Sequence, residues 1–217
     1  MKITTARAAL KAACLLLIAG PAIAATASAP PAPPAGVYAL DKTHTSVSFR
    51  VNHLGFSHYT ARFSRIDGKL TFNSAAPAAM AVEASIAPTS LELNAPPAGF
   101  HDQLMGASWF NAAAFPAITF KSTKVAVTGP TTAQVTGDFT LHGVTRPVTL
   151  AVTYNGGWPA NAMDGSRVGF SAYGVFKRSA FGMGFGVPAA GSTLGVSDDV
   201  EVMIETEFGA GAPVRPK

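Results

Sequence analysis

The side chains that could perform chemistry are few in this sequence, and their spacing does not form a catalytic or metal-binding motif. Histidine is the usual acid–base and metal-binding side chain, and five occur, at His44, His53, His58, His101 and His142. The sequence contains no H-x-H motif, no H-E-x-x-H motif and no histidine grouped with carboxylates. Metal sites normally show such ligand spacing. We therefore expect these histidines to make ordinary hydrogen bonds, and we expect no metal or other cofactor.

Three further segments resemble functional motifs only superficially. Residues 182–186 are glycine-rich, but no helix start follows to receive a phosphate, which argues against dinucleotide binding. In residues 191–195, Ser192 stands one position away from the serine of a G-x-S-x-G nucleophile motif. The acidic residues of 198–207 alternate with apolar ones, so they are expected on the solvated outer face of a strand. No paired acid and base is expected to face inward, and the sequence predicts a protein that is not an enzyme.

Residues 1–24 have the pattern of a secretory signal peptide. Basic residues precede the apolar stretch 12–19, and the small-residue triplet Ala-Ile-Ala at 22–24 ends the segment. This pattern predicts export, cleavage after the triplet and a periplasmic mature protein. The only cysteine, Cys14, leaves with the segment, so neither a disulfide nor a thiolate metal site is expected. Lys11 stands where a lipoprotein signal needs an apolar residue, which argues against a lipid anchor.

Composition and charge exclude several classes of protein. Of the 217 residues, 48% are hydrophobic and 13% are charged, which suits a large buried core and excludes intrinsic disorder. No apolar run reaches the roughly 18–20 residues that a membrane-spanning helix needs, so no stable membrane anchor is expected. Loss of the signal peptide leaves 13 basic and 12 acidic residues, a net charge of +1. A nearly neutral protein lacks the electrostatic attraction on which nucleic-acid binding depends.

The mature chain is expected to contain a linker, one domain and a tail. Residues 25–36 are rich in proline and alanine, which is typical of an extended spacer without side chains that could pack into a core. Residues 37–208 are predicted to form the single domain, and residues 209–217 a flexible tail.

The dominant hydrophobic period of the domain is two, which indicates strands with one apolar and one solvated face. The clearest examples are 46–52, 138–142, 148–154 and 199–208. The dipeptides Asp67-Gly68 and Asn155-Gly156 predict turns. About eight to ten strands are expected, with one short helix at 100–107, so the fold class is all-β. A long antiparallel sheet with one apolar face must close into a barrel or fold into a sandwich.

The order of these segments resembles the YceI family of exported, lipocalin-like barrels. The resemblance covers nearly the whole domain, and its most distinctive run is GDFTLHGVTRPVTL at 137–150. The other matching segments are YALD at 38–41, HTSVSFRVNHLG at 44–55, ARF at 61–63, IDGKLTF at 66–72, WFN at 109–111, FP at 115–116, TFKS at 119–122, RSAFG at 178–182, and 196–207. The resemblance implies a single antiparallel lipocalin-like barrel in the periplasm, which binds polyisoprenoid or similar lipid chains in a long apolar cavity, without catalysis.

The chain departs from the family pattern at one segment. Many members carry R-D-x-H-L before the position of Trp109, whereas this chain has FHDQL at 100–104. Only Leu104 keeps its place, so no role of that Arg, Asp or His is carried over to this chain.

The expected ligand is an elongated apolar molecule, such as a polyisoprenoid chain or an isoprenoid quinone. Its binding site should be the apolar residues that share one parity within their strands. These residues are Val47, Phe49, Val51, Phe63, Leu70, Phe72, Ile86, Phe120, Phe139, Leu141, Leu150, Phe170, Phe176, Val202 and Ile204. The nearest candidates for hydrogen bonds to a quinone or pyrophosphate head group are His53 and Tyr59.

Two other interpretations stay open, because a packed core and a ligand cavity use the same types of residue. One is a structural or stress-related barrel domain that binds no ligand. The other is an enzyme that acts on a small hydrophobic substrate. A hydrophobic or lipid ligand is the expected partner, with no nucleic acid, and the chain is expected to be a monomer or a homodimer.

Overall fold

The computed structural model describes residues 31–212. The expected signal peptide and its cleavage site, the first half of the expected linker (25–30) and residues 213–217 lie outside this range. Within it, strands dominate, and the strand bounds are β1 Gly36–Leu40, β2 Ser46–His53, β3 Ser57–Phe63, β4 Ile66–Phe72, β5 Ala81–Ile86, β6 Leu91–Glu92, β7 Ile118–Val127, β8 Thr132–Leu141, β9 Val144–Trp158, β10 Ser166–Lys177 and β11 Val196–Ala210.

The helical elements of the described residues are short. The α-helix α1 spans Phe100–Met105, and the 3₁₀-helices are η1 (Pro77–Ala79), η2 (Pro88–Ser90) and η3 (Arg178–Phe181). α1 ends two residues before the predicted boundary, because Gly106 leaves the helical conformation while its N–H still bonds to the carbonyl of Gln103. Within residues 31–212, none of the helices has the length and hydrophobicity to cross a membrane.

The strands form one closed antiparallel barrel of eight strands, because three pairs of successive segments lie end to end: β1 with β2, β3 with β4, and β5 with β6, where β5 pairs with β4 and β6 with β3. β1 and β2 both pair with β11: Leu40 is opposite Phe208, and Ser46 is opposite Glu205. β4 pairs with β1 and β3 with β2, so β3 and β4 together make the neighbouring strand. The prediction of an all-β fold with a single antiparallel barrel and one short helix is confirmed.

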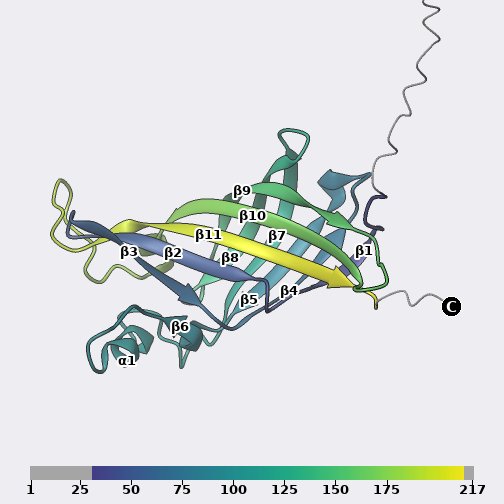
Figure 1. Cartoon of the computed structure of the whole chain (residues 1–217). Helices are drawn as coiled ribbons and strands as arrows, with labels where there is room; N and C mark the ends of the chain where they lie inside the picture. The colour runs from purple at the N-terminus through teal and green to yellow at the C-terminus, as the bar shows by residue number, and fades with distance from the viewer. Residues whose placement is uncertain (1–30, 213–217) are drawn as a thin grey trace, which may run out of the picture.

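The barrel has two ends, which the long strands β9, β10 and β11 connect (Figure 1). At the first, here called the α1 end, lie the β2–β3 turn, the β8–β9 turn, the β10–β11 connection and residues 93–117 with α1. At the second, the linker end, lie the β4–β5, β7–β8 and β9–β10 connections and residues 31–35.

Alternation along the strands separates an apolar interior from a charged exterior. Phe49 of β2 is opposite Val202 of β11, and both side chains face the interior. One residue further along, Arg50 is opposite Glu201, and these side chains meet outside the barrel at 2.7 Å. Side chains on a strand point to opposite faces in turn, so the period of two in the sequence becomes the two faces of the wall.

Two dipeptides that were predicted as turns lie inside strands. Asp67 and Gly68 belong to β4 and pair with β5, and the chain breaks instead at residues 64–65, whose N–H groups bond to Ser90. Asn155 is the extra residue of a β-bulge in β9, where the register with β10 shifts. The glycine beside it, Gly156, has a φ of +130° that suits such a bulge. A bulge and a turn need the same permissive residues, so the dipeptides alone do not distinguish them.

The ordered domain extends slightly beyond its predicted boundaries. β1 begins at Gly36, within the predicted linker, and Pro33 is buried. The Tyr38 hydroxyl donates a 2.7 Å hydrogen bond to the carbonyl of Pro34. The end of the linker therefore packs against the barrel, whereas the sequence analysis predicted an extended spacer without packing contacts. At the other terminus β11 continues through Ala210, which is paired with Ser166 of β10.

Candidate ligand-binding cavity

The interior of the barrel contains a cavity of about 890 Å³. Residues from both ends line it, with His53 and Trp109 at the α1 end and Pro77 and Pro130 at the linker end. The wall is almost wholly apolar, and among the described residues that line it there is no aspartate, glutamate or lysine. Such a cavity suits an apolar ligand.

All fifteen residues predicted to contact the ligand lie on the wall of this cavity. They are Val47, Phe49, Val51, Phe63, Leu70, Phe72, Ile86, Phe120, Phe139, Leu141, Leu150, Phe170, Phe176, Val202 and Ile204. The opposite-parity residues Ser48, Arg50 and Glu201 are not on the wall. Contact of the fifteen residues with a ligand stays a prediction.

Several lining residues were missed by the sequence analysis. Val148, Val152 and Val200 have the same parity as the predicted residues of their strands, so the pattern contained the signal that would have found them. Leu104, which is on α1, and Met183, which follows η3, also line the cavity. They lie outside strands, so no alternating pattern marks them.

The two predicted head-group residues lie at the α1 end of the cavity. His53 is the exposed last residue of β2. Tyr59 is half-buried in β3, and its hydroxyl accepts a 3.1 Å hydrogen bond from the backbone N–H of Asn94. Because that bond uses an acceptor site of the hydroxyl, its proton can still be donated to an oxygen in the cavity.

A buried arginine that the sequence analysis did not select lines the cavity at the same end. Arg178 is only 4% exposed, and its guanidinium donates to four backbone carbonyls. The accepting carbonyls belong to Met183, Phe185, Val196 and Ser197, at distances of 2.7–3.0 Å. Burial lowers the pKa of Arg178 from its ordinary value, yet a guanidinium remains protonated in proteins. Four of its five N–H donors are therefore occupied by carbonyls of the β10–β11 connection and of the start of β11.

Aromatic side chains form a packed cluster at the α1 end of the barrel. The Phe139 ring lies 5.0 Å from Phe176 and 5.3 Å from Phe181, between ring centroids. Phe63 contacts Phe49 at 5.6 Å and Phe110 at 5.9 Å. Phe110 follows α1, so the segment at 93–117 packs its apolar side chains onto the barrel interior at the α1 end.

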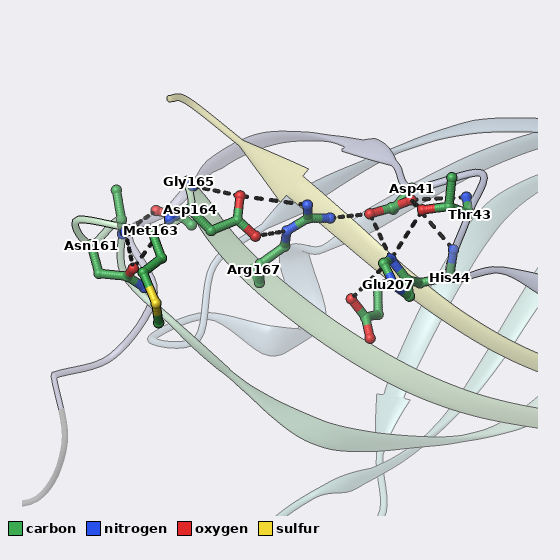
Figure 2. A network of polar contacts seen from close by, with 11 residues as sticks. Asp41, Thr43, His44, Asn161, Met163, Asp164, Gly165, Arg167 and Glu207 are labelled. Carbon is green, nitrogen blue, oxygen red and sulfur yellow. Dashed lines mark hydrogen bonds and ion pairs between the residues drawn. The ribbon is translucent and has the colours of Figure 1, made fainter. Parts of the chain in front are cut away.

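A second polar group lies outside the cavity wall, where β1, β10 and β11 meet (Figure 2). The Asp41 carboxylate accepts hydrogen bonds from the Thr43 hydroxyl at 2.6 Å, from His44 Nδ1 at 3.0 Å and from Arg167. Arg167 also bonds to Asp164, Nε to Oδ2, at 2.6 Å. The bonds link the β1–β2 connection to β10, so they stabilise the closure of the barrel.

This group contradicts the expectation that no histidine is grouped with carboxylates. Atoms of Asp41, His44 and Glu207 that could ligate a metal lie within 4.8 Å of one another. Hydrogen bonds, first from Thr43 and then from His44, hold the pKa of Asp41 well below its usual range. The bond to Asp41 in turn raises the pKa of His44. The grouping was missed because Glu207 is far from the other two residues in sequence.

A closed eight-stranded antiparallel barrel around an apolar cavity defines a lipocalin-like barrel protein. The family model described as "YceI-like domain" matches residues 38–208, which is most of the chain. The chain therefore belongs to the YceI family, as its sequence motifs predicted.

Known relatives and structures agree with this assignment. The chain is 36% identical over 169 residues to a UPF0312 protein of Pseudomonas putida (strain W619), covering 77% of this chain and 86% of that protein. It is similar to the crystal structure of Burkholderia cenocepacia BcnA, with a TM-score of 0.65 and 26% identity, covering 77% of this chain and 98% of that one. It shares its fold with a polyisoprenoid binding domain from Saccharophagus degradans, with a TM-score of 0.58 and 15% identity, over 80% of this chain and 98% of that domain.

Proposed function

We propose that this chain is an exported, periplasmic carrier that binds one long apolar chain, such as a polyisoprenoid or an isoprenoid quinone, inside its barrel and catalyses no reaction on it. The signal-peptide pattern at 1–24 is the reason to propose the compartment. The cavity is the observation that carries the proposed activity.

The size of the cavity argues against a packed structural core. Protein interiors contain few voids larger than a water molecule. An empty, dry cavity of 890 Å³ would cost on the order of 20 kcal/mol at about 24 cal/mol per Å³, more than the roughly 5–15 kcal/mol by which domains are stable. An apolar wall is also a poor host for ordered water. A ligand that fills the cavity removes this cost.

The apolar wall provides enough binding energy for a carrier. Burial of one five-carbon isoprenoid unit contributes roughly 3–4 kcal/mol, at about 0.8 kcal/mol per CH₂. Association opposes this gain with a cost of about 4–15 kcal/mol, so a chain of several units binds tightly. A fold shared with a polyisoprenoid binding domain is consistent with this class of ligand.

The charges on the wall favour an uncharged head group over a pyrophosphate. Arg178 is the one permanently charged side chain among the described lining residues, and backbone carbonyls already occupy four of its donors. A buried pyrophosphate would have no cation left to pair with, and burial of an unpaired charge is costly. A quinone or alcohol oxygen needs only a hydrogen bond, which the Tyr59 hydroxyl is free to donate.

An alanine on the cavity wall provides the test. Ala172 faces the cavity in β10, between Val152 and Ile204, which also line it. Replacement by phenylalanine, A172F, would fill part of the cavity and leave the strand pairing unchanged. Ala151 is exposed on the neighbouring strand β9 and is not on the wall, so A151F is the matched control.

The binding experiment uses protein freed of lipid and titrated with dispersed geranylgeraniol. The expected result is that A172F binds at least about tenfold more weakly than the unmodified chain, since a tenfold change corresponds to only about 1.4 kcal/mol. A151F should bind like the unmodified chain. Equal binding by both variants, or conversion of the alcohol to another compound, would contradict the proposal.

A further inference from the structure

Three large apolar side chains project into solvent at the α1 end of the barrel. Phe56 in the β2–β3 turn is 87% exposed, and Leu194 and Phe185 in the β10–β11 connection are 81% and 56% exposed. Burial of a large apolar side chain is favourable. The exposure of three such side chains at one end of the barrel therefore indicates an interaction surface. We call Phe56, Phe185 and Leu194 the apolar tip.

The two segments that carry the tip are joined to each other. The N–H of Leu54 donates a 2.9 Å hydrogen bond to the carbonyl of Gly195, which holds the β2–β3 turn against the end of the β10–β11 connection. A Cβ atom placed on Gly55 would lie only 3.2 Å from the Thr193 side chain, so the two backbones approach closely there. Phe56 follows Gly55, and Leu194 lies between Thr193 and Gly195. The two side chains therefore project from neighbouring parts of the same surface.

The tip adjoins the cavity. The Phe185 ring packs edge-on against Trp109, with ring centroids 5.5 Å apart. Trp109 lines the cavity, as do His53 and Val196, which lie at the ends of the two segments that carry the tip. An apolar chain that enters or leaves the cavity at the α1 end would pass beside the tip.

The segments that form the tip are uncharged. Residues 179–197 contain no acidic or basic residue and no histidine, and residues 54–57 contain none either. Five of the residues between 182 and 195 are glycines, at 182, 184, 186, 191 and 195. A neutral surface of protruding phenylalanine and leucine side chains on glycine-rich loops is complementary to uncharged hydrocarbon.

These observations lead us to propose that the apolar tip docks the α1 end of the barrel into the surface of a lipid bilayer, which is the source of the apolar chain that the cavity takes up. This inference rests on the proposed function for the origin of the chain. A folded protein partner would need a complementary surface of roughly 800 Å² on each side, whereas separate side chains on loop tips bury fully in fluid hydrocarbon. The absence of charge in both segments means that docking is driven by apolar burial and is insensitive to salt.

Sedimentation with vesicles of uncharged phosphatidylcholine tests the proposal. The tip variant F56S/F185S/L194S is compared with the variant V37S/W158S/M163S, which removes three exposed apolar side chains near the linker end. We expect the exported chain and the linker-end variant to sediment with vesicles equally at low and high salt. The tip variant should partition into the vesicles at least about tenfold more weakly, because it lacks the three apolar side chains that docking would bury in the bilayer.

Binding of dispersed geranylgeraniol, without vesicles, is measured in parallel. The tip variant should bind it like the unmodified chain, which shows that its fold and cavity are intact. Failure of the unmodified chain to sediment, or equal losses in the two variants, would overturn the docking proposal while leaving the carrier function standing. Sedimentation without any uptake of the alcohol would support docking and contradict the carrier function.

Discussion

The guanidinium of Arg178 lies 5.5 Å from the centroid of the Trp109 ring, so a buried cation stacks on an aromatic side chain at the α1 end of the cavity. The same guanidinium holds four carbonyls of the β10–β11 region. Through these contacts Arg178 joins the loop that carries Phe185 to the segment that follows α1. It thus organises the end of the barrel at which we expect ligands to enter.

Replacement of Arg178 by methionine should destabilise the fold strongly. The change leaves one buried and three partly buried carbonyls without donors, at about 1–3 kcal/mol for each buried unsatisfied group, and removes the cation–π contact. We expect R178M to lower the free energy of unfolding by at least about 3 kcal/mol, measured by urea denaturation. R146M is the control, because the exposed side chain of Arg146 makes a single hydrogen bond within residues 31–212, to the carbonyl of Ala180. Similar small losses in both variants would contradict the structural role of Arg178.

The pH dependence of stability should reveal the group around Asp41. The pKa of His44 is raised in the folded state, so its stabilising contribution is complete below the unfolded pKa, near 6.5, and is lost as the pH rises through the folded pKa. H44A should therefore melt at a lower temperature than the unmodified chain at about pH 5.5, and this difference should shrink as the pH rises. A difference that grows toward high pH would contradict this assignment.

The carboxylate of Asp41 should stabilise the fold over a different range. Its pKa is lowered, so its contribution is present above the unfolded pKa, near 3.9, and is lost as the pH falls toward the folded pKa. D41N should lose about 1–2 kcal/mol at neutral pH, measured by thermal unfolding. Asp67 pairs with Lys42 in a largely exposed ion pair, so D67N should change stability by less than about 1 kcal/mol. Equal effects of D41N and D67N would show that the group at the barrel closure has no special role.

Substitution of Gly143 should disturb the packing of the segment after α1. Gly143 has a φ of +75°, and a Cβ atom there would lie 2.3 Å from the Phe115 ring. G143A should therefore cost at least about 1 kcal/mol in unfolding free energy. A Cβ atom placed on Gly184 would meet no other atom within 4 Å, and the φ of Gly184 is not positive, so G184A is a suitable control. A neutral G143A variant would contradict both the cost of the positive φ and the clash with Phe115.

A charge introduced inside the barrel should prevent folding at a fully buried position and abolish ligand binding at a half-buried position on the cavity wall. Leu141 is 4% exposed within a buried cluster, so L141R should not fold, because nothing there pairs with the charge. Phe49 is half-buried on the cavity wall, so F49D should stay folded with a loss of about 1–3 kcal/mol and should not bind geranylgeraniol. Circular dichroism and ligand titration are the measurements, with outward-facing S48D as the control. A folded F49D variant that binds normally would place the ligand elsewhere.

The alternating pattern predicted the strands and the inner face of the wall, because within each strand apolar residues face the interior and polar residues face the solvent. Val47, Phe49 and Val51 alternate with polar neighbours, and all three line the cavity. The same pattern did not distinguish a packed interior from a hollow one, since that depends on how far apart opposite walls stand. The bulge at Asn155 was mistaken for a turn because both features use permissive residues.

The polar features were missed because they depend on contacts between distant parts of the chain. Asp41, His44 and Glu207 form a group only because β1 and β2 follow one another along β11. Arg178 belongs to the segment RSAFG, which resembles the family pattern. Its hydrogen-bond partners are backbone carbonyls, which every residue type provides, so the sequence does not reveal them. Only the three-dimensional register brings these groups together.

Mass spectrometry of an organic extract of the protein, purified from cells without detergent, tests the central claim most directly. The account predicts about one molecule of a long, uncharged apolar chain for each barrel, as one continuous cavity implies. It also predicts that the A172F variant, purified in parallel, contains much less of the same compound, while A151F contains as much as the unmodified chain. An extract without any lipid, or equal amounts of the compound from all three proteins, would contradict the claim that the cavity is a binding site.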